Sequence, residues 1–255
     1  MNILAVIPAR YNSQRFPGKP LVRIDDRPMV QWVYEAAKRC PAFSQVVVAT
    51  DSTAIADCVR RFGGVVEMTR SDHQTGTDRV AEVAERYPEM TAIANVQGDQ
   101  PFVTADMLTQ LVTPYLQGES PDMTTLACPL HEESYNDPNA VKVLCDRRDR
   151  ALYFSRSPIP YYRNAGSAPV FHHLGLYAFS RNFLAKYAQL TPTPLEHCEG
   201  LEQLRVLEHG YAIVVCQTQK AVLEINTPSD LLQAQALIAQ NTIKEVVSQK
   251  SKVKS

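Results

Sequence analysis

The stretch MNILAVIPARYNSQRFPGKP, residues 1–20, decides the fold class. Residues 3–7 form a short apolar run without charge, and Pro8 ends it. A run of this kind is typical of a strand that is buried on both faces, as the strands of a parallel sheet are. The stretch therefore predicts that the chain begins with a strand of a parallel sheet.

The loop after this strand is rich in positive charge and is stiffened by glycine and proline. Its cations are Arg10, Arg15 and Lys19, and Gly18 directly precedes the last of them. Fixed cations and free backbone N–H groups just past the carboxyl end of a first strand suit a ligand that carries phosphate. The alternative is a solvated basic loop, which the stiffness of the segment and the short spacing of its cations make the weaker interpretation.

The first half of the chain repeats a strand–helix pattern. Apolar strands are expected at residues 45–50, 65–68 and 93–96, and helices at 28–40, 52–62, after residue 79 and at 104–116. This β-α-β-α-β-α order predicts a parallel sheet with right-handed crossovers.

The second half is expected to add strands and two further helices. The strands are expected at 123–128, 141–145, 171–179 and 211–216, and the helices at 194–209 and 228–240. No internal repeat and no long linker divides the chain, so residues 1–240 are expected to form one domain. The lysine-bearing end, residues 241–255, is expected to be a disordered tail.

Composition limits the classes of protein and of partner. The chain has 255 residues, of which 45% are hydrophobic, which suits one globular α/β domain. A net charge of −1 gives no support for binding to nucleic acid or to a membrane surface. The N-terminal apolar run is too short for a signal peptide, and no stretch has the length of a membrane span. The six cysteines are scattered without a CxxC pair, which indicates a reducing cytoplasm rather than a metal cluster.

Asp99 is the candidate metal ligand. It follows the expected strand at 93–96 closely, with Gly98 before it. A carboxylate at the carboxyl end of a strand is well placed to hold Mg²⁺ against the phosphates of a substrate. An isolated aspartate there is more simply a turn residue, but the basic loop at the same edge of the sheet favours a metal site.

A second polar loop is expected at that edge, and its members are His73, Thr75, Gly76 and Thr77. Small residues and hydroxyls can approach a nucleotide base or ribose closely. Considered alone, the same residues would be a helix start capped by Thr77.

These segments together resemble the opening and core motifs of the 3-deoxy-manno-octulosonate (Kdo) cytidylyltransferases. The resemblance covers residues 2 to about 240, in order and at similar spacing. It rests on IPARYNSQRFPGKP (7–20), ATD (49–51), MTR (68–70), DHQTGT (72–77), NVQGD (95–99), PNAVKV (138–143), ALYFSR (151–156), HLGLY (173–177) and LEHCEGLEQLR (195–205). The first motif alone indicates only a sugar nucleotidyltransferase, whereas the later ones are far more specific.

The resemblance implies a Rossmann-like nucleotidyltransferase fold of the α/β class, with a mixed, mostly parallel sheet flanked by helices. It implies an enzyme that makes CMP-Kdo and pyrophosphate from CTP and Kdo, or from a close relative such as an amino-substituted Kdo. It also implies a homodimer, which we expect to form largely through residues 141–190.

The resemblance further assigns roles to individual residues. The catalytic set is Lys19, Arg10, Arg15 and Asp99, with the three cations on the triphosphate and Lys19 stabilising charge at the α-phosphate. CTP would be held by Pro8, Ala9, Arg10, Lys19, His73, Thr75, Gly76, Thr77 and Gln97. The acid sugar would be held by Gln97, Arg156, His173, Tyr177, Glu202 and Gln203, and Mg²⁺ by Asp99 and Asn226. His173 and Tyr177 share one face of a strand, and Gly175 between them leaves room for a ligand; simple core packing is the alternative for both.

Three positions depart from the family pattern. Asn226 stands where the family usually has a magnesium-binding aspartate before Thr-Pro, so one oxygen remains but the charge is lost. Gln100 stands where glutamate is commoner, and His172 stands where the family usually has arginine or lysine.

The departures leave two alternatives open beside the activation of Kdo. One is a CTP-dependent enzyme for a different acid acceptor, and the other is a nucleotide-binding paralogue with weakened turnover. Retention of Arg10, Arg15, Lys19 and Asp99 speaks against the paralogue, because a remnant has little physical need for all four.

Overall fold

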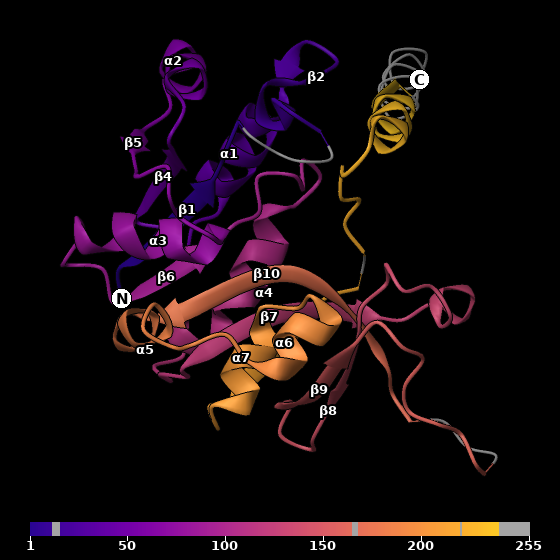
Figure 1. Ribbon diagram of the computed structural model, residues 1–255. Helices are drawn as coiled ribbons and strands as arrows, with labels where there is room; N and C mark the ends of the chain where they lie inside the picture. The colour runs from indigo at the N-terminus through magenta and orange to yellow at the C-terminus, as the bar shows by residue number, and fades with distance from the viewer. Residues whose placement is uncertain (12–15, 165–167, 220, 240–255) are drawn as a thin grey trace, which may run out of the picture.

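A nine-stranded mixed sheet organises the chain in the computed structural model, which describes residues 1–11, 16–164, 168–219 and 221–239 (Figure 1). Arg15 and the tail at 241–255 lie outside the described residues. The strands of this sheet are β1 (Ile3–Pro8), β4 (Gln45–Thr50), β5 (Val66–Met68), β6 (Ala92–Asn95), β7 (Met123–Pro129), β8 (Lys142–Cys145), β9 (Ala151–Ser155), β10 (Phe171–Ser180) and β11 (Ile213–Gln217). Their order is β11-β7-β10-β6-β1-β4-β5, with β8 beside β10 and β9 beside β8.

Strand directions confirm the predicted fold class. β1 pairs in parallel with β4 on one side and β6 on the other, so that Val6 lies opposite both Val47 and Asn95. β10 is antiparallel to its neighbours β6 and β7, and β11 is parallel to β7. The parallel half comes from the predicted β-α-β repeat, and β10 makes the sheet mixed.

Helices cover both faces of this sheet (Figure 1). They are α1 (Met29–Arg39), α2 (Thr53–Arg61), α3 (Gly76–Glu85), α4 (Ala105–Leu116), α5 (Arg181–Tyr187), α6 (Pro194–Glu199) and α7 (Gln203–Glu208), with 3₁₀ turns η1 (Lys19–Leu21) and η2 (Glu132–Ser134). Along β1, Ile3 and Ile7 join one core cluster with α1, α2 and α4, whereas Leu4 and Val6 join another with α3, α5 and α7. All residues from 3 to 7 are fully buried, as the opening run predicts.

Helices α2 and α4 begin after the capping residues that the sequence predicts. Ser52 caps α2 through Ile55 N–H, and Thr104 caps α4 through Met107 N–H. The cap of α3 is Thr75 rather than Thr77, because the Thr75 hydroxyl and the Asp78 carboxylate form a capping box.

The prediction of a single helix at 194–209 is wrong, since the segment forms two helices, α6 and α7. Gly200 ends α6 with φ +62°, a left-handed conformation that favours glycine. The break turns the chain so that Glu202 and Gln203 face the sheet edge instead of continuing along a helix surface.

Several elements were not predicted. β9 has 5 residues and α5 has 7, so each offers too few apolar positions to establish a period in the sequence. A two-stranded hairpin of β2 (Arg23–Ile24) and β3 (Arg27–Pro28) precedes α1. The expected last helix is present, since residues 228–239 are helical, and its Ala234 packs with Ile24 and Met29. None of the described helices combines the length and apolar character needed to cross a membrane.

Candidate active site

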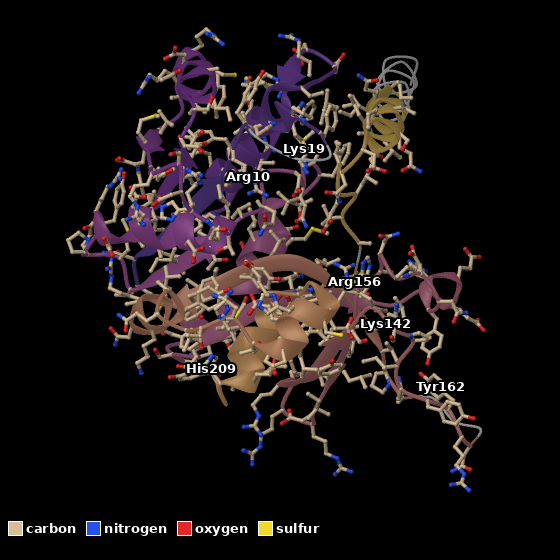
Figure 2. All side chains as sticks on the ribbon, in the orientation of Figure 1. Arg10, Lys19, Lys142, Arg156, Tyr162 and His209 are labelled. Carbon is tan, nitrogen blue, oxygen red and sulfur yellow. The ribbon has the colours of Figure 1, made fainter. Side chains whose placement is uncertain are left out.

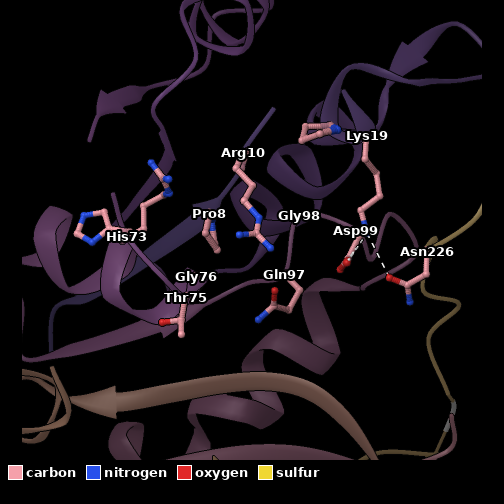
Figure 3. A pocket seen from close by; sticks show the side chains of 13 residues that line it. Pro8, Arg10, Lys19, His73, Thr75, Gly76, Gln97, Gly98, Asp99 and Asn226 are labelled. Atoms are coloured by element: carbon pink, nitrogen blue, oxygen red, sulfur yellow. Dashed lines mark hydrogen bonds and ion pairs between the residues drawn. The ribbon is translucent and has the colours of Figure 1, made fainter. Parts of the chain in front are cut away.

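Two adjoining cavities open at the carboxyl ends of β1 and β6. The first is lined by Pro8, Ala9, Arg10, Lys19, Pro20, His73, Thr75, Gly76, Arg79, Gln97, Gly98, Asp99 and Asn226 (Figure 3). The second is larger, about 690 Å³, and lies toward β10 and α7. Gln97, Asp99 and Asn226 line both cavities and therefore form the wall at which they meet.

Lys19 ties this shared wall together. Its Nζ donates to Asp99 Oδ2 at 2.7 Å and to Asn226 Oδ1 at 3.3 Å (Figure 3). The three residues come from η1, the turn after β6 and the segment before the last helix, and the Lys19 side chain is only 15% exposed. A mostly buried cation between two oxygens is fixed in position, and a more negative group such as a phosphate would bind it more strongly than these oxygens do.

The structure places almost all of the predicted CTP residues together. Every one of them except Thr77 lines the first cavity. Thr77 is fully buried, and its hydroxyl donates to Glu202 Oε1 at 2.9 Å and accepts from Asn95 Nδ2. Because α3 begins at Gly76, the Thr77 side chain points into the fold rather than toward the cavity. Arg15 lies outside the described residues.

The predicted acid-sugar residues line the second cavity, and they are Gln97, Arg156, His173, Tyr177, Glu202 and Gln203. In Figure 2, Arg10 and Lys19 lie in the N-terminal half, whereas Arg156 lies in the second half of the chain. The two predicted sets thus occupy neighbouring cavities rather than one.

A hydrogen-bond chain fixes the floor of the second cavity. Tyr177 O–H donates to Gln203 Oε1, and Gln203 Nε2 donates to His173 Nδ1. His173 Nε2–H then donates to Thr125 Oγ1 at 2.9 Å, since the Thr125 hydroxyl proton is used on the Leu176 carbonyl. This series of hydrogen bonds selects the neutral tautomer of His173 that carries its proton on Nε2. Burial lowers the pKa of His173 to about 3.

Gly175 leaves space above this floor. It has φ +65°, in the bulge where β10 changes register against β7. A Cβ there would lie 3.6 Å from Glu224 Oε1, a residue with no predicted role. The face shared by His173 and Tyr177 is confirmed, as their ring centroids lie 5.5 Å apart.

Comparison with known proteins places this arrangement in a family. The model of the Cytidylyltransferase family matches residues 4–220. The chain belongs to the cytidylyltransferase family. It is 71% identical to a curated 3-deoxy-manno-octulosonate cytidylyltransferase of Acaryochloris marina, over 94% of this chain and 98% of the relative. It is 54% identical to one of Synechococcus elongatus, over 94% and 99%.

A solved structure agrees in shape as well as in sequence. The structure of a CMP:2-keto-3-deoxy-manno-octonic acid synthetase complexed with CTP superposes with a TM-score of 0.90 at 40% identity, covering 94% of this chain and 100% of that one. The predicted Rossmann-like nucleotidyltransferase fold and the predicted enzyme class, a nucleotidyltransferase, are therefore confirmed.

The geometry of this cytidylyltransferase suits a divalent cation at the shared wall. Asp99 Oδ2 and Asn226 Oδ1 converge on one cationic atom, Lys19 Nζ, which shows that two oxygens can face a single positive charge there. Among the described residues, no group of three His, Cys, Asp or Glu side chains is placed to hold a metal. One carboxylate and one amide oxygen suit Mg²⁺, which takes its remaining ligands from water and substrate phosphates.

The other two departures from the family pattern also lie at the cavities. Gln100 is buried and donates to the Leu174 carbonyl at 2.6 Å and to Glu224 Oε1 at 3.0 Å. His172 lines the second cavity opposite Lys142, and burial lowers the pKa of His172. At neutral pH, His172 therefore adds no charge where the family usually has a cation.

Sequence reasoning missed Glu224 in this cytidylyltransferase. Its carboxylate lines the second cavity and accepts hydrogen bonds from the side-chain amides of Gln100 and Asn226. Partial loss of water contact in the cavity wall, and then the charge of Asp99, raises the pKa of Glu224. A signal was present, because Glu224 and Asn226 are two residues apart in an extended segment and so share one side.

Replacement of Glu202 gives a pH-dependent prediction. Burial raises the pKa of Glu202 from 4.5 to about 6, although the Thr77 hydrogen bond acts in the opposite direction. The folded state therefore binds this proton more tightly than the unfolded state, and ionised Glu202 costs stability above pH 6. We expect Glu202→Gln to melt at a higher temperature than the parent at pH 8, with the difference shrinking between pH 6 and 4.5. Thermal unfolding at a series of pH values measures this, and a difference that grows toward low pH would contradict it.

Proposed function

We propose that the protein transfers the CMP group of CTP to the anomeric hydroxyl of Kdo, or of a closely related 3-deoxy acid sugar, with release of pyrophosphate. The observation that carries the proposal is the contact of Lys19 with Asp99 and Asn226 of the shared wall, where the first cavity meets the second. The curated names of relatives at 71% and 54% identity supply the substrates. They favour Kdo over a different acid acceptor and over a paralogue with weakened turnover.

CTP would occupy the first cavity. Arg10 and Lys19 would neutralise the triphosphate, while the Pro8–Ala9 backbone and the loop at 73–76 would enclose the nucleoside. His73 is held for this role by Glu82, whose Oε2 lies 2.5 Å from His73 Nε2.

The acid sugar would occupy the second cavity, where Arg156 is the cation able to meet its carboxylate. Arg156 is held by its own Nε, which donates to the Glu199 carbonyl, and by Nη1, which donates to the Pro138 carbonyl. The fixed Tyr177–Gln203–His173 chain would present polar groups to the sugar hydroxyls.

The reaction then needs positioning and charge neutralisation more than covalent chemistry. The anomeric hydroxyl attacks the α-phosphorus in line and its proton passes to solvent, while the bond from the α-phosphorus to the α–β bridging oxygen breaks and pyrophosphate leaves. Lys19, released from Asp99 and Asn226 by the more negative triphosphate, would meet the charge that develops at the α-phosphate. Mg²⁺ held by Asp99 and Asn226 would neutralise the phosphate oxygens.

The direct test is turnover with defined substrates. We expect CMP-sugar and pyrophosphate to form in equal amounts from CTP and Kdo, with kcat/KM for CTP at least about 100-fold above that for ATP or GTP. The reason is the close approach of Pro8 to the loop at 73–76, where a Cβ on Gly76 would lie 3.4 Å from Pro8 Cγ, because limited space suits a pyrimidine better than a purine. Comparable rates with a purine triphosphate would contradict the nucleotide assignment, and no product across a panel of 3-deoxy acids would contradict the function.

We also propose a homodimer formed through the second-half segment at 141–190. The chain between β9 and β10 extends away from the body with Tyr162 on it (Figure 2), and Tyr161 on the same segment is 90% exposed. Exposed Leu152 on β9 adds apolar surface nearby in sequence. We expect sedimentation velocity at micromolar concentration to give twice the mass of 28.5 kDa. A monomer under these conditions would contradict the proposal.

A cytoplasmic location is proposed on chemical grounds. All six cysteines are free in the structure, which suits a reducing compartment.

A further inference from the structure

Asn226 lies between the Lys19 ammonium group and the Glu224 carboxylate. Its Oδ1 accepts from Lys19 Nζ at 3.3 Å, and its Nδ2 donates to Glu224 Oε2 at 3.3 Å. An ammonium group can only donate, and a carboxylate can only accept. Both neighbours therefore select the same orientation of the Asn226 amide, with its oxygen toward Lys19 and Asp99.

A second hydrogen bond fixes the Glu224 carboxylate in the position from which it orients Asn226. Its second oxygen, Oε1, accepts from Gln100 Nε2 at 3.0 Å. Gln100 is only 1% exposed and is fixed in turn by a 2.6 Å hydrogen bond to the Leu174 carbonyl. The two carboxylate oxygens of Glu224 thus each have an amide donor, one from the buried Gln100 and one from Asn226.

The backbone beside Asn226 is held as firmly as the side chain. Ile225 N–H donates to the Asp99 carbonyl at 3.0 Å, and Asn226 N–H donates to Asp230 Oδ2 at 2.8 Å. Asn226 can therefore change what it offers to the shared wall mainly by rotating its amide. Rotation would replace an oxygen with an NH₂ group, which repels a cation.

Of the two groups that orient the Asn226 amide, only Glu224 keeps its hydrogen bond to Asn226 throughout the proposed reaction. When a triphosphate enters the first cavity, Lys19 moves its charge toward the phosphates, and Asn226 Oδ1 loses that donor. Only Glu224 then continues to select the amide orientation. We propose that Glu224 is a positioning residue that keeps the Asn226 oxygen facing the cation site at Asp99.

This inference rests on the proposed function only in placing a divalent cation and CTP at the shared wall. An orienting partner matters because an amide has one oxygen and one NH₂ group. A carboxylate at residue 226 would present an oxygen in either rotamer and would need no such partner. Groups that orient a metal ligand are commonly worth about 10- to 100-fold in metal affinity.

A double-mutant cycle on metal binding tests it. Mn²⁺ affinity is measured by electron paramagnetic resonance in the presence of CTP and without acceptor, so no turnover is involved. The proteins are the parent, Glu224→Ala, Asn226→Asp and the double variant. We expect Glu224→Ala to weaken Mn²⁺ binding about tenfold when residue 226 is Asn, and less than about twofold when it is Asp. Glu224 is exposed to the cavity, so its truncation leaves no buried void.

Glu85→Ala, which removes an exposed carboxylate on α3, is the matched control for net charge and should leave Mn²⁺ affinity unchanged. Equal weakening by Glu224→Ala in both backgrounds would overturn the proposal, since it would make Glu224 a direct ligand or a general electrostatic contributor. No weakening in the Asn226 background, or no Mn²⁺ binding by the parent, would overturn it as well. CMP transfer by the parent is measured separately, so a failed orienting role is distinguishable from a failed function.

Discussion

Lys19→Ala is expected to lower kcat for CMP transfer by about 100- to 1,000-fold, the range seen when a group that stabilises developing charge is removed. Lys19 contacts Asp99 and Asn226 of the shared wall, as the dashed lines in Figure 3 mark. Its removal also leaves Asp99 without a counter-charge, which adds repulsion against the triphosphate. Pyrophosphate release under saturating CTP and acid sugar measures the effect.

The fold should survive this substitution. Lys19 begins the short turn η1 at the rim of a cavity, so truncation removes a hydrogen-bonding group but no core packing. Lys38→Ala, on the exposed side of α1, is the control and should keep both the parent kcat and the parent melting temperature. Near-parent kcat for Lys19→Ala would remove Lys19 from the phosphate role.

The sequence predicts the nucleotide half of the site well because its residues follow directly from strands. The buried run at 3–7 predicts β1, and the loop after it contains Arg10 and Lys19, which the structure places at the cavity. Parallel neighbours end at one sheet edge, so Asp99 after β6 was expected to face the same cavity as Lys19, and their 2.7 Å contact spans 80 residues of sequence.

The acceptor half could be predicted only through family motifs, because it depends on tertiary context. Asn226 is 207 residues from Lys19 and reaches it through an extended segment without periodicity. The position of Glu202 depends on the break at Gly200, which a periodic apolar pattern concealed. Glu224 has no motif of its own; its only sequence signal is its place two residues before Asn226, and its two amide partners show its role.

The support beneath the acceptor cavity depends on Lys142, a fully buried cation on β8. Its Nζ donates to the backbone carbonyls of Asp137 at 2.7 Å, Ala140 at 2.9 Å and Arg156 at 2.8 Å. An ammonium group has three protons, so all of its donors are used. Lys142 thereby joins the loop at 137–140 to the start of the Arg156 segment, and both line the second cavity (Figure 2).

Lys142→Met should therefore affect stability and acceptor binding together. Methionine fills similar space but leaves three carbonyl oxygens without their donor, which should cost about 2–4 kcal/mol of unfolding free energy. At about 2–4 °C per kcal/mol for a chain of this size, the melting temperature should fall by about 5–15 °C. Below that temperature, the KM for the acid sugar should rise about tenfold while the KM for CTP stays unchanged, because only the second cavity loses its support. Lys186→Met, on the exposed face of α5, should change none of these quantities. An equal rise in both KM values would mean that Lys142 supports the whole fold rather than the acceptor cavity.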